Sequence, residues 1–288
     1  MVAGVIEQGL IYGIMILGVY ISYKILDFPD LTVDGSFTLG AAITTVLIIK
    51  GCNPYLCLPV SLVFGGIAGL CTGIIHVKFK IRDLLSGIIM MMVLYSINLR
   101  IVGRANVAFM NANTIFTNNF PSSFLGGYQK VIIILVIIVI IKILLDLYLK
   151  TKSGYLLLAT GQNSNLVNSL SKNSGNMKII GLVIENALVA LSGSILCQDQ
   201  RFFEITMGTG AVIIALASVI IGIQLLKNVK FFKSTTSVII GSIVYKFGIA
   251  ISLYIGFQAT DMRLITAILF LAVLIIGQGE SKKKIKST

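Results

Sequence analysis

The stretch QKVIIILVIIVIIKILLDLYL, residues 129–149, decides the fold class of this 288-residue chain. A predominantly apolar run of about 20 residues is long enough to cross the hydrocarbon core of a bilayer as a helix. Comparable runs recur on both sides of it, at 5–23, 33–49, 55–77, 83–101, 178–197, 208–226, 235–256 and 262–277. The sequence therefore predicts an all-α, polytopic membrane protein with about eight to ten transmembrane helices.

The composition excludes several function classes. Hydrophobic residues make up 56% of the chain and charged residues 12%, whereas soluble domains carry about 25% charged residues. A nucleic-acid binder is excluded in spite of the net charge of +12, because a basic excess in a membrane protein reports topology. We find no Gly-x4-Gly-Lys-Ser/Thr loop for ATP, no catalytic constellation and no metal-ligand cluster around the single histidine, His76. We therefore expect no enzyme activity, no metal and no cofactor bound by this chain.

The positive charges predict the topology. If alternate loops are placed on the same side of the membrane, 15 of the 23 Lys and Arg residues lie on one side and six on the other. The remaining two, Lys142 and Lys246, lie within spans. The richer side holds the 24–32, 78–82, 150–178 and 227–233 loops and the C-terminal tail. The positive-inside rule makes this side cytoplasmic, so we expect an outside N-terminus and a cytoplasmic C-terminus.

Two loops are longer than turns. We expect a single transmembrane domain over residues 1–280, with an extracellular loop at 103–127, a cytoplasmic loop at 150–178 and a basic tail at 281–288. The cytoplasmic loop carries a short amphipathic pattern at Leu166, Val167 and Leu170, between Gly161 and Gly175. This pattern predicts a short helix along the cytoplasmic face, which could pack on the membrane surface or dock into a partner.

Two spans are predicted to be interrupted, the second and the seventh. The second span begins with glycine and polar residues at 32–36, and the seventh begins in the same way at 206–210. Broken helices occur in a membrane only where protein or a water-filled cavity covers the backbone. The stretches that follow, from Gly35 and from Gly208, resemble each other. Matching interruptions in two halves favour an inverted repeat with the solute path between the halves, although chance composition remains an alternative.

Polar side chains inside the membrane are candidates for this path, since they are costly there. An ion pair between Glu185 and Lys246 would let both stay charged, as a purely structural pair or as part of transport, but the sequence does not show that the two residues meet. The candidate path residues are Asp34, Ser36, Thr38, Glu185, Asn186 and Thr209. The repeated small residues Gly65, Gly69 and Gly73 are interpreted as a helix-packing stripe.

Three stretches resemble a known family. ILDFPDLTVDGSFTLGAA (residues 25–42), LYSINLRIVGR (94–104) and LVALSG (188–193) are similar to permease subunits of bacterial ABC importers. Within the superfamily of branched-chain amino acid and ribose permeases, the resemblance is greatest to the tryptophan/tyrosine-type permeases, and it covers residues 9–276. The chain departs from the family pattern at Leu158, Arg201, Ile223 and 170–175.

The resemblance implies partners and a mechanism. It implies a second permease copy, two ATP-binding subunits that carry ATP and Mg, and an extracellular or periplasmic solute-binding protein. ATP-driven closure of the ATPases would move the permease between inward- and outward-open states in the bacterial cell membrane. The implied ATPase-coupling residues are Ala159, Thr160, Gly161, Gln162, Asn163, Leu166 and Leu170.

Three functions remain open at this point. The first is an ABC importer permease for a small solute, with an aromatic amino acid favoured. The second is an ion- or proton-coupled carrier that works without ATPase subunits through Glu185, Lys246 and Asp34. The third is a membrane scaffold or sensor, which predicts that no binding protein engages loop 103–127.

Overall fold

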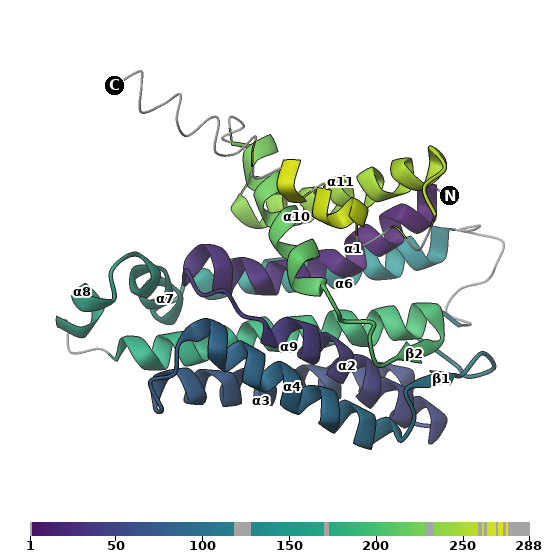
Figure 1. Ribbon diagram of the computed structural model, residues 1–288, viewed down its shortest axis with the longest axis horizontal. Helices are drawn as coiled ribbons and strands as arrows, with labels where there is room; N and C mark the ends of the chain where they lie inside the picture. The colour runs from purple at the N-terminus through teal and green to yellow at the C-terminus, as the bar shows by residue number, and fades with distance from the viewer. Residues whose placement is uncertain are drawn as a thin grey trace.

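The computed structural model describes residues 2–117, 128–169, 173–227, 233–258, 261, 264–268, 270–272 and 275. Almost all of the regular structure in these ranges is helical (Figure 1). The elements are α1 (Val2–Val19), the π-helix η1 (Tyr20–Ile25), α2 (Thr32–Ile49), α3 (Pro54–Val77), α4 (Asp83–Val102), β1 (Asn106–Ala108), α6 (Gln129–Leu149), α7 (Lys152–Gln162), α8 (Ser164–Ser169), α9 (Ser174–Gln200), β2 (Phe202–Glu204), α10 (Ala211–Leu225) and α11 (Ser234–Tyr254).

The helix lengths confirm the predicted polytopic membrane fold. Within the described ranges, seven helical segments are long and apolar enough to cross a membrane, the first of them being α1 continued by η1. The apolar helix α10 is shorter, with 15 residues. Residues 264–268, in the last predicted span, are also helical.

The helices form two packed groups. In Figure 1, α2, α3, α4 and α9 lie together below, while α1, α6, α10 and α11 lie together above. The two groups meet where α1 packs along α9. The short helices α7 and α8 lie at one end of the molecule and the β1–β2 pair lies at the opposite end (Figure 1). We call these the α7–α8 end and the β1–β2 end.

Of the two predicted interruptions, the structure bears out one and moves the other. Residues 206–210 form turns before α10, and Gly210 has a φ of 83°, which glycine adopts without a Cβ penalty. By contrast, residues 32–36 are helical, so the predicted break inside the second span is wrong. The break lies earlier, at 26–31, because the π-helical hydrogen bonding of η1 ends the first span there and Asp30 starts α2 by accepting the Thr32 N–H.

Each of the two breaks, at 26–31 and at 201–210, joins one apolar helix to the next. The first joins α1–η1 to α2, and the second joins α9 to α10. Figure 1 shows α1 running from the β1–β2 end toward the α7–α8 end, whereas α9 runs the other way. This arrangement agrees with an inverted repeat, which stays a prediction.

Glycines bring α3 and α9 into direct backbone contact. A Cβ atom on Gly65 would overlap Asn186 O and the Ala190 side chain, and one on Gly69 would overlap Leu182 O. Close approach of this kind allows helices to pack tightly in a membrane, where the hydrophobic effect gives no attraction between them. The small-residue stripe is therefore a packing device, as its spacing predicts.

We expect Gly69→Ala to destabilise the protein by about 2 kcal/mol, because adding a methyl group to a filled contact typically costs 1–3 kcal/mol. Gly66→Ala is the matched control on the same helix, since its Cβ would lie 3.5 Å from the nearest atom, Val183 Cγ1. Thermal unfolding of both variants in the same detergent measures the difference. Equal melting temperatures would contradict the packing role of Gly69.

Candidate functional site

Asp34 joins the start of α2 to the start of α10. Its carboxylate accepts the backbone N–H of Gly210 at 2.8 Å and that of Val212 at 3.0 Å. The N-cap residue of α10 is Gly210, which has no side chain to satisfy these donors. Asp34 therefore supplies the cap from another helix, and its negative charge is stabilised by the positive end of the α10 dipole.

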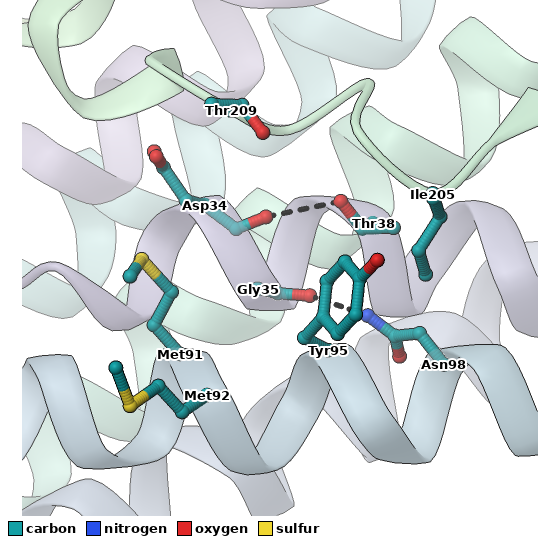
Figure 2. A pocket seen from close by; sticks show the side chains of 9 residues that line it. All are labelled: Asp34, Gly35, Thr38, Met91, Met92, Tyr95, Asn98, Ile205 and Thr209. Carbon is teal, nitrogen blue, oxygen red and sulfur yellow. Dashed lines mark hydrogen bonds between the residues drawn. The ribbon is translucent and has the colours of Figure 1, made fainter.

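A cavity of about 270 Å³ lies beside this cap (Figure 2). Helix α2 forms one wall, α4 forms the second, and the 205–210 connection covers it. The lining residues are Asp34, Gly35, Thr38, Met91, Met92, Tyr95, Asn98, Ile205 and Thr209. This volume is close to the lower end of small-molecule pockets, roughly 300 Å³, so the cavity suits a small solute.

The wall between α2 and α4 is fixed by the side chain of Asn98. Its Nδ2 donates to the Gly35 carbonyl at 3.1 Å, while its Oδ1 has no hydrogen-bond partner in the described part of the chain. Asn98 is only 1% exposed, and a buried amide oxygen without a donor is costly. Asn98 thus fixes α4 to α2, while its oxygen is sealed within the wall and does not face the open cavity.

The connection over the cavity lies directly against α2. A Cβ on Gly208 would overlap the Asp34 carbonyl oxygen and crowd Thr38 Oγ1, which itself donates to that carbonyl at 3.1 Å. Only glycine allows this approach. Asp34 therefore contacts the connection in two ways. Its carboxylate accepts hydrogen bonds from Gly210 and Val212, and its carbonyl oxygen lies directly against Gly208.

A second polar cluster lies behind α2, away from the cavity lining. Asn186 donates to Asp30 Oδ2 at 2.9 Å and accepts from Ser36 Oγ at 2.7 Å. Full burial raises the pKa of the Asp30 carboxyl, while hydrogen bonds from Thr32 and Asn186 act to lower it. This network ties the 26–31 break to α2 and α9.

The predicted path residues therefore divide into two sets. Asp34, Thr38 and Thr209 line the cavity. Ser36 and Asn186 bond to each other in the buried cluster, and Glu185 accepts from Ser22 Oγ on η1.

The hypothetical Glu185–Lys246 pair does not form. Among the described residues no ion pair joins them, and Lys246 Nζ instead lies 3.6 Å from the centre of the Tyr12 ring. A buried ammonium over an aromatic face is stabilised by the ring quadrupole. A salt bridge between these two residues is therefore not present in the described part of the chain.

The residues expected to couple to an ATPase lie at the α7–α8 end. Ala159, Thr160, Gly161 and Gln162 form the last turn of α7, and Asn163 separates α7 from α8. Gly161 packs against the backbone of Ile25 and Leu26, so that a Cβ there would overlap the Ile25 carbonyl oxygen. Leu166 lies in the α8 backbone, and Leu170 lies outside the described residues. The predicted short helix is present as α8.

Sequence reasoning missed the α4 wall. Of the three consecutive methionines in α4 only Met90 is buried, while Met91 and Met92 line the cavity. Tyr95 and Asn98 are polar residues within an apolar span. Such residues are a signal for function, and they could have been found by the rule that selected Glu185.

A multi-pass helical bundle, with a mainly apolar cavity that carries a few polar groups beside a helix capped by a carboxylate from another helix, defines a membrane transport protein. Comparison with known families specifies the class further. The model of the family described as "branched-chain amino acid transport system / permease component" matches residues 1–276. The chain belongs to this permease family.

Relatives with similar sequences carry related names. A tyrosine transport system permease protein from Clostridioides difficile is 46% identical over 276 residues, covering 96% of this chain and 91% of that protein. A probable branched-chain amino acid transport permease protein LivH from Methanocaldococcus jannaschii is 26% identical, covering 98% and 94%. Both comparisons extend over nearly the whole chain, so the shared architecture is not confined to one motif.

A solved structure has the same overall fold. PsaBC from Streptococcus pneumoniae in complex with Fab aligns with a TM-score of 0.55 at 15% identity, over 98% of this chain and 94% of that one. At this identity the likeness concerns the fold alone.

Proposed function

We propose that this chain is the permease subunit of an ATP-driven importer that moves an amino acid with an aromatic side chain. The observation that carries the proposal is the cavity beside Asp34, at the junction of α2, α4 and the broken entry to α10. The name of the Clostridioides difficile relative supports tyrosine or a similar amino acid as the solute. The cavity volume of about 270 Å³ suits a single small molecule of this kind.

The lining offers complementary chemistry for such a solute. The Asp34 carboxylate accepts hydrogen bonds, as an ammonium group requires. Met91, Met92 and Tyr95 offer soft and aromatic surfaces, and thioether–aromatic contacts are favourable. We propose that the ammonium group faces Asp34 and that the ring faces α4.

The α4 wall also indicates how the path is completed. Met92 is 65% exposed and Tyr95 is 51% exposed on the surface of this chain. We propose that a second permease copy packs against this face, so that the cavities of both copies open on a shared path. Asp34, Thr38 and Thr209 then belong to the path, while Ser36, Glu185 and Asn186 stiffen the helices around it.

ATP hydrolysis is assigned to partner subunits. We propose that they bind at the α7–α8 end and hold ATP and Mg, and that residues 159–170 couple their closure to the permease. By the positive-inside rule this end, with the C-terminus, is cytoplasmic. A solute-binding protein then engages the β1–β2 end, near residues 103–127. The 1–280 region acts as one permease domain with a basic tail at 281–288.

Uptake in proteoliposomes tests the proposal. We expect ATP-dependent uptake of labelled tyrosine only when the permease, its ATPase subunits and the solute-binding protein are all present. Omitting the ATPase or using a non-hydrolysable nucleotide should reduce uptake to that of empty vesicles. Uptake by this chain alone, driven by a proton or sodium gradient, would instead establish a secondary carrier.

A further inference from the structure

A second cavity, of about 480 Å³, opens at the α7–α8 end. Apart from Ser164, which lies in the proposed coupling segment, its lining residues have no role in the transport proposal. The α3–α4 connection forms one side of it, and the starts of α8 and α9 form the other. The polar residues that line it are His76, Lys80, Arg82, Asp83, Ser164, Ser174 and Lys178. We call this the basic pocket.

The histidine of the basic pocket positions one of its lysines. His76 Nδ1 lies 2.9 Å from the Ile81 carbonyl oxygen, so Nδ1 carries the proton and donates. The other ring nitrogen, Nε2, is then an acceptor, and Lys178 Nζ lies 3.4 Å from it. Phe28 holds the ring by an edge-to-face contact at 4.9 Å. The Lys178 ammonium keeps further N–H donors for another molecule.

Within the described ranges, no acidic side chain forms an ion pair with the cations of the basic pocket, Lys80, Arg82 and Lys178. The one acidic lining residue, Asp83, accepts the Leu84 N–H at 2.9 Å in the first turn of α4. Three cations against one carboxylate leave a net positive cavity. Such a cavity attracts an anion.

Apolar side chains next to the basic pocket identify the kind of anion. Phe79, Leu84 and Leu85 are 70%, 47% and 50% exposed, respectively. The pocket lies at the C-terminal end of α3 and at the N-terminal ends of α4 and α9. In a spanning helix bundle the helix ends lie at the level of the lipid headgroups. Basic pockets between transmembrane helices suit anionic headgroups. A soluble phosphate would make no use of the neighbouring apolar surface.

We propose that the basic pocket binds the phosphate headgroup of an anionic phospholipid, with its acyl chains along Phe79, Leu84 and Leu85. Arg82 and Lys178 bind the phosphate, and His76 positions Lys178. The lipid would then join the α3–α4 connection to the starts of α8 and α9. This site is separate from the solute cavity and does not depend on the solute.

Lipid retention measured by native mass spectrometry tests the site. The full chain in detergent is mixed with phosphatidylglycerol or with phosphatidylcholine of identical acyl chains. We expect bound phosphatidylglycerol to fall at least fivefold in the double variant Arg82→Gln/Lys178→Gln, with phosphatidylcholine unchanged. The matched control is Lys50→Gln/Arg104→Gln, which removes two exposed charges at the β1–β2 end and should bind as the wild type does. His76→Ala should give a smaller loss, and Lys178→Arg should retain binding.

The other outcomes overturn the proposal. Equal losses in the pocket and control variants would mean that total charge alone attracts the lipid. Displacement of phosphatidylglycerol by millimolar inorganic phosphate would identify a site for a soluble anion. Normal lipid binding with failed ATPase assembly in Arg82→Gln/Lys178→Gln would identify a protein contact. If that double variant does not fold, Lys80→Gln replaces it, with a loss of at least twofold expected.

Discussion

Replacing Asp34 by alanine should reduce tyrosine uptake about a hundredfold. The variant removes both acceptors of the Gly210 and Val212 N–H groups, as well as the charge at the start of α10. Losing a cap costs about 1 kcal/mol and losing the dipole interaction costs up to about 2 kcal/mol. Both losses fall at the entry to α10 beside the cavity, so we expect them to raise the barrier to transport in folded permease by about 3 kcal/mol. A factor of ten corresponds to about 1.4 kcal/mol, which gives the expected hundredfold loss.

Asp34→Asn separates the charge from the hydrogen bonds. Its amide oxygen can accept one N–H while its nitrogen opposes the other, so uptake should lie between the wild type and Asp34→Ala. Asp199→Asn is the control. It removes a carboxylate that does not line the cavity and that forms an ion pair with Lys130, with 2.6 Å between Oδ1 and Nζ. Uptake is compared at equal amounts of folded permease in the membrane. Uptake by Asp34→Ala within about threefold of the wild type would exclude Asp34 from the path.

Gly161→Ala should uncouple ATP hydrolysis from uptake. The added Cβ would overlap the Ile25 carbonyl oxygen, so the end of α7 must move away from η1 and the 26–31 break. The 26–31 break is bonded to the first turn of α2, because Asp30 in the break accepts the N–H of Thr32. We expect uptake to fall at least about tenfold, equivalent to 1.4 kcal/mol, while basal ATP hydrolysis changes less than twofold.

The matched control for this substitution is Gly4→Ala, whose Cβ meets no atom within 4 Å. It tests the intrinsic effect of alanine in a helix, which should leave uptake unchanged. The ratio of solute transported to ATP hydrolysed is measured in the same proteoliposomes. An unchanged ratio in Gly161→Ala would remove α7 from the coupling route.

The sequence predicted part of the candidate site. Asp34, Thr38 and Thr209 were predicted from glycine and polar residues beside apolar runs, and they line one cavity. The α4 wall was missed, because Met91 and Tyr95 fit a lipid-facing or core helix equally well in a pattern of apolar residues. The sequence could only raise a Glu185–Lys246 pair as a hypothesis, because the pairing of two distant spans depends on helix packing, which the local pattern does not encode.

Residues 129–149 and the other apolar runs determined by themselves that this chain spans a membrane, because length and apolarity alone satisfy the bilayer. The spacing of Gly65, Gly69 and Gly73 likewise determined a close helix contact. Tertiary structure decided the partner of that contact, α9, and placed the Asp34 carboxylate at the start of α10. The physical reason is that lipid-facing and protein-facing surfaces are both apolar in a membrane helix. Only the packed bundle distinguishes them, through close backbone contacts and satisfied polar groups.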